Sequence, residues 1–301
     1  MARETVQSPV IFDRALLQRR RERAMALGAA TFLLERAAAD LAERLSAVLR
    51  KFELAADLGT PTDAVRRALA DRVGTIIALV ERPILAARAP LTAVADLEAL
   101  PLREGALDLA VSALSLQFVN DLPGTLVQIR RALKPDGLFL AALVGGASLA
   151  ELREAFAAAE AEIEGGISPR VAPFVDVREL GALLQRAGFA LPVTDVDRVV
   201  VRYASPLALL RDLRRMGATN ALIERRRLPL RRATLRRMMD IYKARFSDTD
   251  GRVRATFEIV WLSGWAPHPS QQKPLQPGSA QARLADALGT REISTGEKTG
   301  L

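Results

Sequence analysis

Residues 52–70, FELAADLGTPTDAVRRALA, predict a buried strand, a turn and a helix. The run Phe52–Leu58 is short and apolar and is followed by Gly59, as is typical of a strand that ends in a turn. The segment Ala64–Ala70 then carries the spacing of a helix. A buried strand that turns directly into a helix is the basic unit of an α/β fold.

The same alternation continues along the next part of the chain. A helix-like stretch is expected after Glu81 and a helix at Leu122–Leu133, and strands are expected at Thr75–Val80, Ala106–Ser112 and Leu138–Val144. Strands that alternate with helices indicate a parallel sheet covered on both faces.

The second half of the chain adds helices and two late strands. Helices are predicted at Ser148–Glu164 and Asp176–Ala187, and strands at Val196–Tyr203 and Val253–Trp265. The arginine-rich segment between these strands, about residues 205–246, predicts a helical insertion. Two strands around such an insertion favour an antiparallel edge to the sheet, with the insertion as a lid over the strand ends.

Three parts of the chain are therefore expected. Ala15–Leu49 is rich in helix formers and has no internal proline, so residues 1–49 predict an N-terminal helical arm. Residues 50–267 form the α/β domain. Residues 268–301 are rich in proline, glutamine, serine and glycine and predict a tail that cannot bury enough apolar area to order itself.

Composition excludes several kinds of site. The chain has no cysteine and one histidine, His268, which rules out disulfides, cysteine-rich zinc sites and most histidine-based catalysis. We expect no metal. No apolar run approaches the roughly 18 residues that span a bilayer, and no secretory signal is evident at the start, so the predicted location is the cytoplasm.

The charge is basic, with 43 Lys and Arg against 35 Asp and Glu. The excess is largely arginine in Arg14–Arg23 and Arg211–Arg237. A basic surface favours an acidic partner, but aromatic residues for stacking on bases are not interleaved with these arginines. Solvated helix faces explain the pattern, and a nucleic-acid methyltransferase has support only from charge.

Several stretches resemble one known family. They are Ile11–Arg14, Asp108–Pro123, Leu133–Gly137, Gly165–Pro169 and Asp212–Gly217. Together they resemble the complex I assembly-factor family of class I S-adenosyl-L-methionine-dependent methyltransferase-like proteins, which includes arginine-hydroxylase-type factors. A more distant resemblance is to the malonyl-carrier-protein O-methyltransferase of biotin synthesis. The resemblance implies a Rossmann-like class I methyltransferase sheet of seven strands, with the cofactor across the carboxyl ends of the first strands.

The resemblance also implies where S-adenosyl-L-methionine would bind. Asp57 and Gly59 match the acidic residue and the first glycine of the loop after strand one, whereas Pro61 and Asp63 stand where further glycines are expected. Without a ligand the loop can also be a purely structural turn, with Thr60 as helix N-cap and Pro61 at the first helical position.

Four further residues complete the expected site. Glu81 is the candidate acceptor for the ribose hydroxyls, although Val80 holds the family's acid position, and a side chain one place later can instead point into solvent. Asp96 would accept from the adenine amine, Leu97 would cover the ring, and Ser112 would line the methyl-transfer face. Gln117 replaces a histidine common in relatives, so no catalytic base is identified.

Two hypotheses follow from these observations. The first is an enzyme, either a methyltransferase or a family-type arginine hydroxylase, that acts on a protein substrate such as a respiratory-complex subunit. The second is a degenerate methyltransferase fold that serves as an assembly or binding module. Neither the acceptor nor the oligomeric state follows from the residues.

Overall fold

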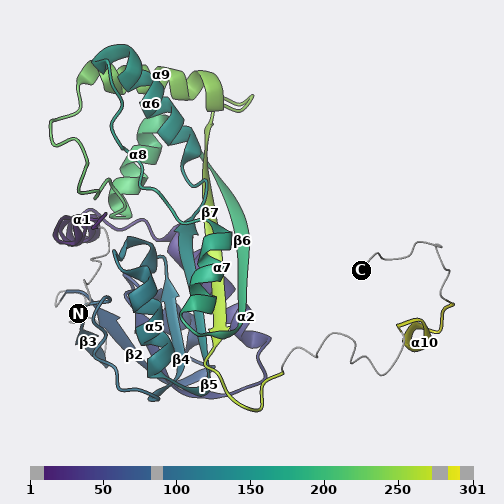
Figure 1. Cartoon of the computed structure of the whole chain (residues 1–301). Coiled ribbons are helices and arrows are strands. Elements are labelled where there is room, and N and C mark those ends of the chain that lie inside the picture. Colours follow the sequence, from purple (N-terminus) through teal and green to yellow (C-terminus); the bar gives the residue numbers. More distant parts are fainter. Residues whose placement is uncertain (1–9, 83–90, 273–283, 292–301) are drawn as a thin grey trace, which may run out of the picture. The chain divides into compact units, whose positions relative to one another are not determined.

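A single sheet organises the chain, and its strands lie in the order β3-β2-β1-β4-β5-β7-β6 (Figure 1). This computed structural model describes residues 10–82, 91–272 and 284–291. The strands are β1 Phe52–Leu58, β2 Val73–Val80, β3 Thr92–Val94, β4 Leu107–Ala113, β5 Leu133–Gly145, β6 Ala190–Tyr203 and β7 Val253–Trp265. The first five pair in parallel, whereas β7 is antiparallel to both β5 and β6. The predicted α/β sheet with an antiparallel edge is confirmed.

Strand boundaries agree with the prediction in some strands and differ in others: β6 begins at Ala190, six residues before the predicted start at Val196. Both β1 and β7 begin and end where the sequence indicates. Strand β5 is longer than predicted because Leu133 already pairs with Leu107, before an irregularity in register. Strand β3 was not predicted, because three residues are too few to show a period. The helix-like stretch expected after Glu81 falls largely on residues 83–90, outside the described residues.

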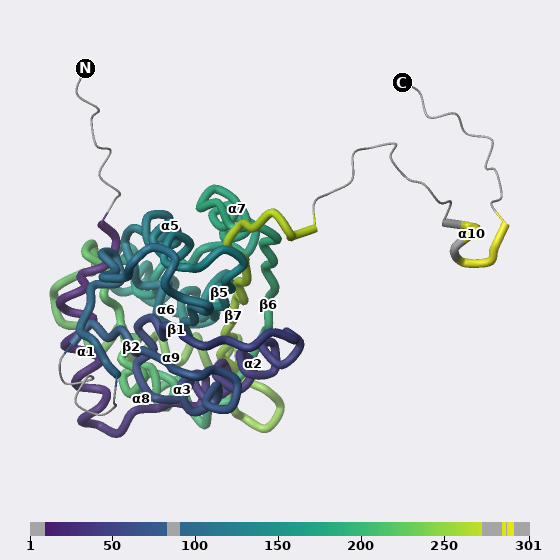
Figure 2. The backbone as a smooth tube through the Cα atoms, turned by 90° about the horizontal axis from the view of Figure 1, so that it is seen from below, coloured from purple at the N-terminus to yellow at the C-terminus, as the bar shows by residue number. Residues whose placement is uncertain are grey.

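Helices cover both faces of the sheet (Figure 2). On one face lie α5, Leu122–Ala132, and α7, Val177–Arg186. On the other lie α2, Phe32–Ser46, and α3, Ala64–Leu69. Strands buried on both faces need the near-continuous apolar sequence that β4 has, with all seven of its residues buried.

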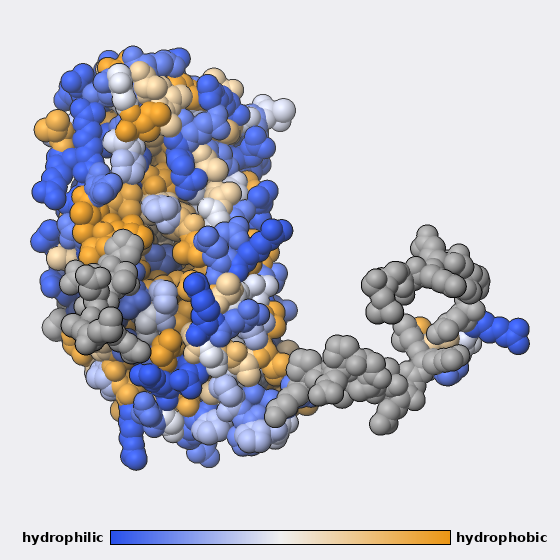
Figure 3. Space-filling model, in the orientation of Figure 1, coloured by the Kyte–Doolittle hydropathy of each residue, from blue (hydrophilic) through white to orange (hydrophobic). Residues whose placement is uncertain are grey.

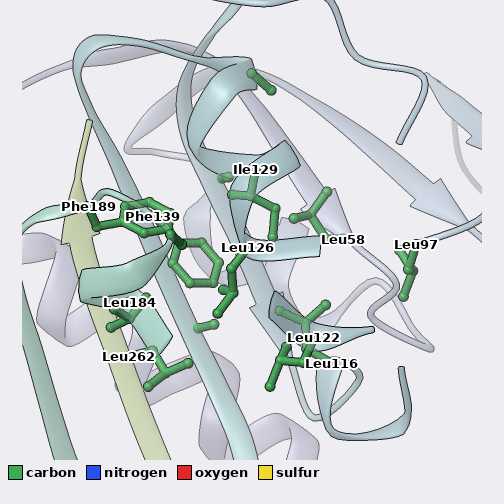
Figure 4. Close-up of a cluster of buried hydrophobic side chains, with 14 of the residues drawn as sticks. Leu58, Leu97, Leu116, Leu122, Leu126, Ile129, Phe139, Leu184, Phe189 and Leu262 are labelled. Atoms are coloured by element: carbon green, nitrogen blue, oxygen red, sulfur yellow. The ribbon is translucent and has the colours of Figure 1, made fainter. Parts of the chain in front are cut away.

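The core under α5 and α7 consists of interlocking leucines and two phenylalanines (Figure 4). Leu126 and Leu184 are fully buried there, and the rings of Phe139 and Phe189 stack with their centroids 5.4 Å apart. Burying one such side chain contributes about 1.5–3 kcal/mol. This face therefore holds β4, β5 and β7 at fixed positions beneath the site described below.

The N-terminal arm is not one helix, as Ala15–Leu49 predicted, but two. Helix α1, Arg14–Ala26, ends just before Gly28, which has a φ of +78°. Glycine adopts this left-handed conformation readily and ends helices. The Gly28 carbonyl accepts a hydrogen bond from Arg215 Nε at 2.7 Å. The break lets α2 pack on the sheet while α1 lies at the strand ends.

The insertion also forms at the carboxyl ends of the parallel strands. Helices α8, Pro206–Arg215, and α9, Arg232–Phe246, pack with α6, Ala150–Glu164, around a third apolar cluster. Figure 1 shows these three helices beyond the same end of the sheet, with α1 beside them. Residues 1–267 form one compact unit and residues 268–301 another, in which α10 is the short helix Leu284–Leu288. The division of residues 1–267 into an arm and a domain stays a prediction.

Candidate cofactor-binding site

Gly59 marks the closest approach of three segments at the carboxyl ends of the strands. Its N–H donates to Leu79 O at 2.8 Å, and its φ is +74°. A Cβ at this position would lie 2.6 Å from both Leu97 Cδ1 and Ser115 Oγ. Only glycine fits such a turn without displacing its neighbours. The loop after β1, the Leu97 turn and the segment after β4 therefore meet at this point.

The loop after Gly59 is held by β4 and not by a helix cap. Thr60 Oγ1 accepts from the Ala113 N–H at 3.2 Å, and α3 begins only at Ala64. The prediction that Thr60 caps a helix with Pro61 at its first position is therefore wrong. It failed because the hydroxyl of Thr60 is used by the neighbouring strand, which local sequence does not reveal.

Two further expected residues lie beside this loop. Ser112 is buried, and its hydroxyl donates to Leu58 O at 2.7 Å, so it ties β4 to β1. Asp63 lies on the surface, where its carboxylate is 3.2 Å from Arg67 Nε. The negative charge of Asp63 is thus compensated within α3.

Asp57 is a buried acid with an unsatisfied oxygen. Its side chain has no exposed surface, and Oδ2 lies 3.2 Å from Arg66 Nη1. Among the described residues, Oδ1 has no hydrogen-bond partner. Burial raises the pKa of Asp57 to about 7, because the charged form loses its hydration. Buried polar atoms are seldom left without a partner, so Oδ1 is an acceptor that a bound ligand could satisfy.

Glu81 is enclosed by side chains of α1. Arg14 Nη2 is 2.9 Å from one carboxylate oxygen and Arg21 Nη1 is 2.8 Å from the other, which Gln18 also contacts. The Glu81 side chain is only 9% exposed. Because β2 ends at Val80, strand alternation does not decide where Glu81 points. The alternative that Glu81 is solvated is wrong.

Arg14 connects Glu81 to the Asp96 turn. The same guanidinium lies 2.5 Å from Asp96 Oδ1 and 3.2 Å from Glu98 Oε2. Leu97 between these acids is buried against Gly59. Glu81 and Asp96 are thus joined by α1, and Leu97 contacts the Gly59 turn. Asp57 lies two residues before Gly59, near the end of β1.

The sequence prediction missed the α1 residues in this site. Arg14, Gln18 and Arg21 are spaced four and three residues apart, which places them on one face of a helix. That spacing is visible in the sequence, but nothing there shows that this face meets Glu81. Part of the signal for the position of α1 is the motif Ile11–Arg14. The Ile11 and Phe12 N–H groups donate to Asn120 Oδ1 at 2.8 and 2.7 Å, which fixes the start of α1 beside the segment after β4.

A cavity of about 320 Å³ adjoins these residues. It is lined mainly by apolar side chains of α1, α2, α6 and α8, and by Pro61, Thr62, Gln117 and Phe118. Within the described part of the chain no Asp or Glu lines it, whereas Arg21, Arg170 and Arg215 do. On the face drawn in Figure 3, apolar surface gathers at the level of α1.

The described residues offer the cavity no evident general base. Gln117, at the position of the family's histidine, donates to Leu114 O at 2.8 Å, and its Oε1 has no partner. In the ranges 10–82, 91–272 and 284–291 no group of three His, Cys, Asp or Glu side chains could hold a metal ion. No helix among those residues combines the length and apolarity needed to cross a bilayer.

Comparison with known proteins supports the fold. A methyltransferase domain model matches residues 56–141. Two solved structures align over most of the chain, a methyltransferase-like protein from Bacillus halodurans and the YcgJ protein from Bacillus subtilis. Their TM-scores are 0.50 and 0.52, their identities 14% and 12%, and they cover 75% and 76% of this chain and 99% and 98% of their own.

Sequence relatives are closer. The protein named arginine-hydroxylase NDUFAF5, mitochondrial, of Danio rerio is 46% identical over 192 residues, which are 64% of this chain and 60% of that protein. The malonyl-[acyl-carrier protein] O-methyltransferase of Laribacter hongkongensis is 40% identical over 194 residues, 64% of this chain and 63% of that protein. The chain spans less than two thirds of the length of these relatives.

The arrangement of the strands and the sequence matches both indicate a methyltransferase fold. The sheet has the seven strands that the resemblance implies, and β7 is antiparallel beside β5 as the late strands predicted. The chain therefore has the class I methyltransferase fold and is similar in sequence to the proteins named arginine-hydroxylase NDUFAF5.

Proposed function

We propose that the chain binds S-adenosyl-L-methionine at the carboxyl ends of β1, β2 and β4. The observation that carries this proposal is Glu81, a nearly buried acid at the end of β2. Arg21 links this acid to the Gly59 turn, because Arg21 pairs with Glu81 and also contacts Ser115, which lies against Gly59. An acid in this place accepts hydrogen bonds from ribose hydroxyls in related α/β sites. The unpaired Asp57 Oδ1 and the glycine-only turn fit a ligand that needs acceptors and close backbone approach.

Each expected residue has a role in this proposal. Glu81 would accept from the ribose hydroxyls, Asp96 from the adenine amine, and Leu97 would cover the ring. Gly59 would lie beside the methionine part, Asp57 would offer its Oδ1 as an acceptor, and Ser112 would line the methyl-transfer face. When bound, the cofactor supplies an activated methyl group on sulfur. The cavity beside Gln117 would hold the acceptor side chain in line with that group.

The proposed activity is modification of a protein substrate in the assembly of respiratory complex I, by methylation or by family-type arginine hydroxylation. Orientation of two reactants in a closed site can provide much of the rate acceleration, so the absence of a base beside Gln117 does not prevent methyl transfer. The location of the chain in the cell stays a prediction; the curated NDUFAF5 relatives carry the word mitochondrial in their names.

One observation favours the second candidate, a non-catalytic assembly module. Glu81 and Asp96 already have cationic partners in Arg14 and Arg21, so these two acids are satisfied without a ligand. Pro61 also lacks the N–H that a glycine would offer. In this case the fold would present its surface to a partner and bind no cofactor.

Calorimetric titration with S-adenosylhomocysteine separates the two candidates. We expect the wild-type chain to bind, and Glu81→Gln to bind at least about tenfold more weakly, because a hydrogen bond to a charged group contributes about 1.5–3 kcal/mol. Glu104→Gln is the matched control, since Glu104 is exposed in the turn before β4, at the opposite edge of the sheet. Absence of binding by the wild type would favour the module.

A further inference from the structure

Arg21 is a buried cation whose ion pair uses only one end of its guanidinium group. The residue is 8% exposed and lies on the cavity wall together with Pro61. Its Nη1 is 2.8 Å from Glu81 Oε2, and its guanidinium carbon lies 5.5 Å from the centre of the Phe118 ring. In the described part of the chain its Nη2 contacts Ser115 Oγ, at 3.5 Å.

The second half of this guanidinium is therefore weakly engaged. A guanidinium has five N–H donors and matches a carboxylate with two parallel hydrogen bonds. Burial and the neighbouring Arg14 lower the pKa of Arg21, while Glu81 acts in the opposite direction. A second anion beside Nη2 would compensate this cost.

The anion expected there is a carboxylate from the loop side of the cleft. Ser115 Oγ, the contact of Nη2, is also the atom that a Cβ on Gly59 would meet at 2.6 Å. The guanidinium thus spans the space from Glu81 to the turn after β1. In that turn Pro61 removes an N–H that could bind an amino-acid carboxylate.

We propose that Arg21 binds the α-carboxylate of the cofactor's amino-acid part, and so replaces the backbone donor that the loop lacks. The inference rests on the proposed cofactor function and adds a residue that no motif of the loop contains. It also gives α1 a role: one face of the helix orders the Glu81 acid through Arg14 and Gln18, and its Arg21 end reaches the amino-acid part.

Two ligands distinguish binding of the α-carboxylate by Arg21 from a general disturbance of the binding cleft. S-adenosylhomocysteine has the α-carboxylate, whereas 5′-methylthioadenosine keeps the adenine, ribose and thioether but lacks the amino-acid part. Both are titrated into wild type, Arg21→Ala, Arg21→Lys and the control Arg19→Ala, which changes an exposed arginine of the same helix. The thermal unfolding midpoint of each variant is measured alongside.

The expected result is a loss of affinity only for the ligand that has the α-carboxylate. Arg21→Ala should weaken the binding of S-adenosylhomocysteine by about 10- to 100-fold, as expected for a charged hydrogen-bonded pair. It should weaken the binding of 5′-methylthioadenosine by less than about threefold. Arg21→Lys should lose less than Arg21→Ala, and Arg19→Ala should bind both ligands as wild type does. Equal losses for the two ligands, or no loss for either, would overturn the inference while leaving the proposed function intact. Failure of the wild type to bind either ligand would overturn both.

Discussion

Replacing Glu160 with alanine is expected to lower the free energy of unfolding by about 3–5 kcal/mol, the usual cost of breaking a buried ion pair from one side. The Glu160 side chain on α6 has no exposed surface. It accepts hydrogen bonds from the Ser168 N–H at 2.7 Å, the Ser168 hydroxyl at 2.8 Å and Arg170 Nε at 2.7 Å. Although burial alone would raise it, these bonds hold the pKa of Glu160 below its ordinary value. The substitution leaves Arg170 at the cavity wall without its carboxylate.

Urea unfolding followed by circular dichroism measures this effect. Glu162→Ala is the matched control, because Glu162 lies on the same helix and its pair with Arg237 is exposed at the surface. Exposed pairs contribute little, so the control should stay close to wild type. Equal losses of stability in the two variants would show that the hydrogen bonds of Glu160 to Ser168 and Arg170 do not stabilise the Gly165–Pro169 loop.

Asp57→Asn is expected to stabilise the chain at pH 8 but not at pH 4. The pKa of Asp57 is raised from 3.8 to about 7 by burial. Between these values the native state keeps a proton that the unfolded state has released, so wild-type stability falls as the pH rises from about 4 to about 7. Above pH 7 the full cost is present, on the order of 4 kcal/mol. Asparagine carries no charge and avoids it.

The measurement is the difference in free energy of unfolding between Asp57→Asn and wild type across pH 4 to 8. The difference should move in favour of the variant through the pH 4–7 window and then level off. A difference that is constant with pH would contradict the raised pKa. The contact with Arg66 lowers the pKa of Asp57, and the value of about 7 already includes this effect.

The sequence predicted the sheet well because its signals are local. The strand Phe52–Leu58 and the strand Val253–Trp265 have apolar patterns bounded by turns, and both formed where predicted. The break at Gly28 was missed because helix formers surround it, and a single glycine is tolerated in a helix. Its bond from Arg215 comes from 187 residues away, which no local pattern can show.

The candidate site was predicted in part. Because parallel strands end at one edge, Glu81, Asp96 and Gly59 were expected to come together, and the structure places them at that edge. The contribution of α1 could not be predicted, because it depends on a fold-back of the arm over the strand ends. Thr60 illustrates the same limit, since its hydroxyl serves β4 and not the helix that follows it in sequence.

A crystal structure of the chain with S-adenosylhomocysteine bound tests the central claim most directly. The account predicts the ribose hydroxyls within hydrogen-bond distance of Glu81, the adenine against Leu97 beside Asp96, and the sulfur towards the cavity that Gln117 lines. A ligand bound elsewhere on the chain, or a ribose that leaves Glu81 paired only with Arg14 and Arg21, would contradict it.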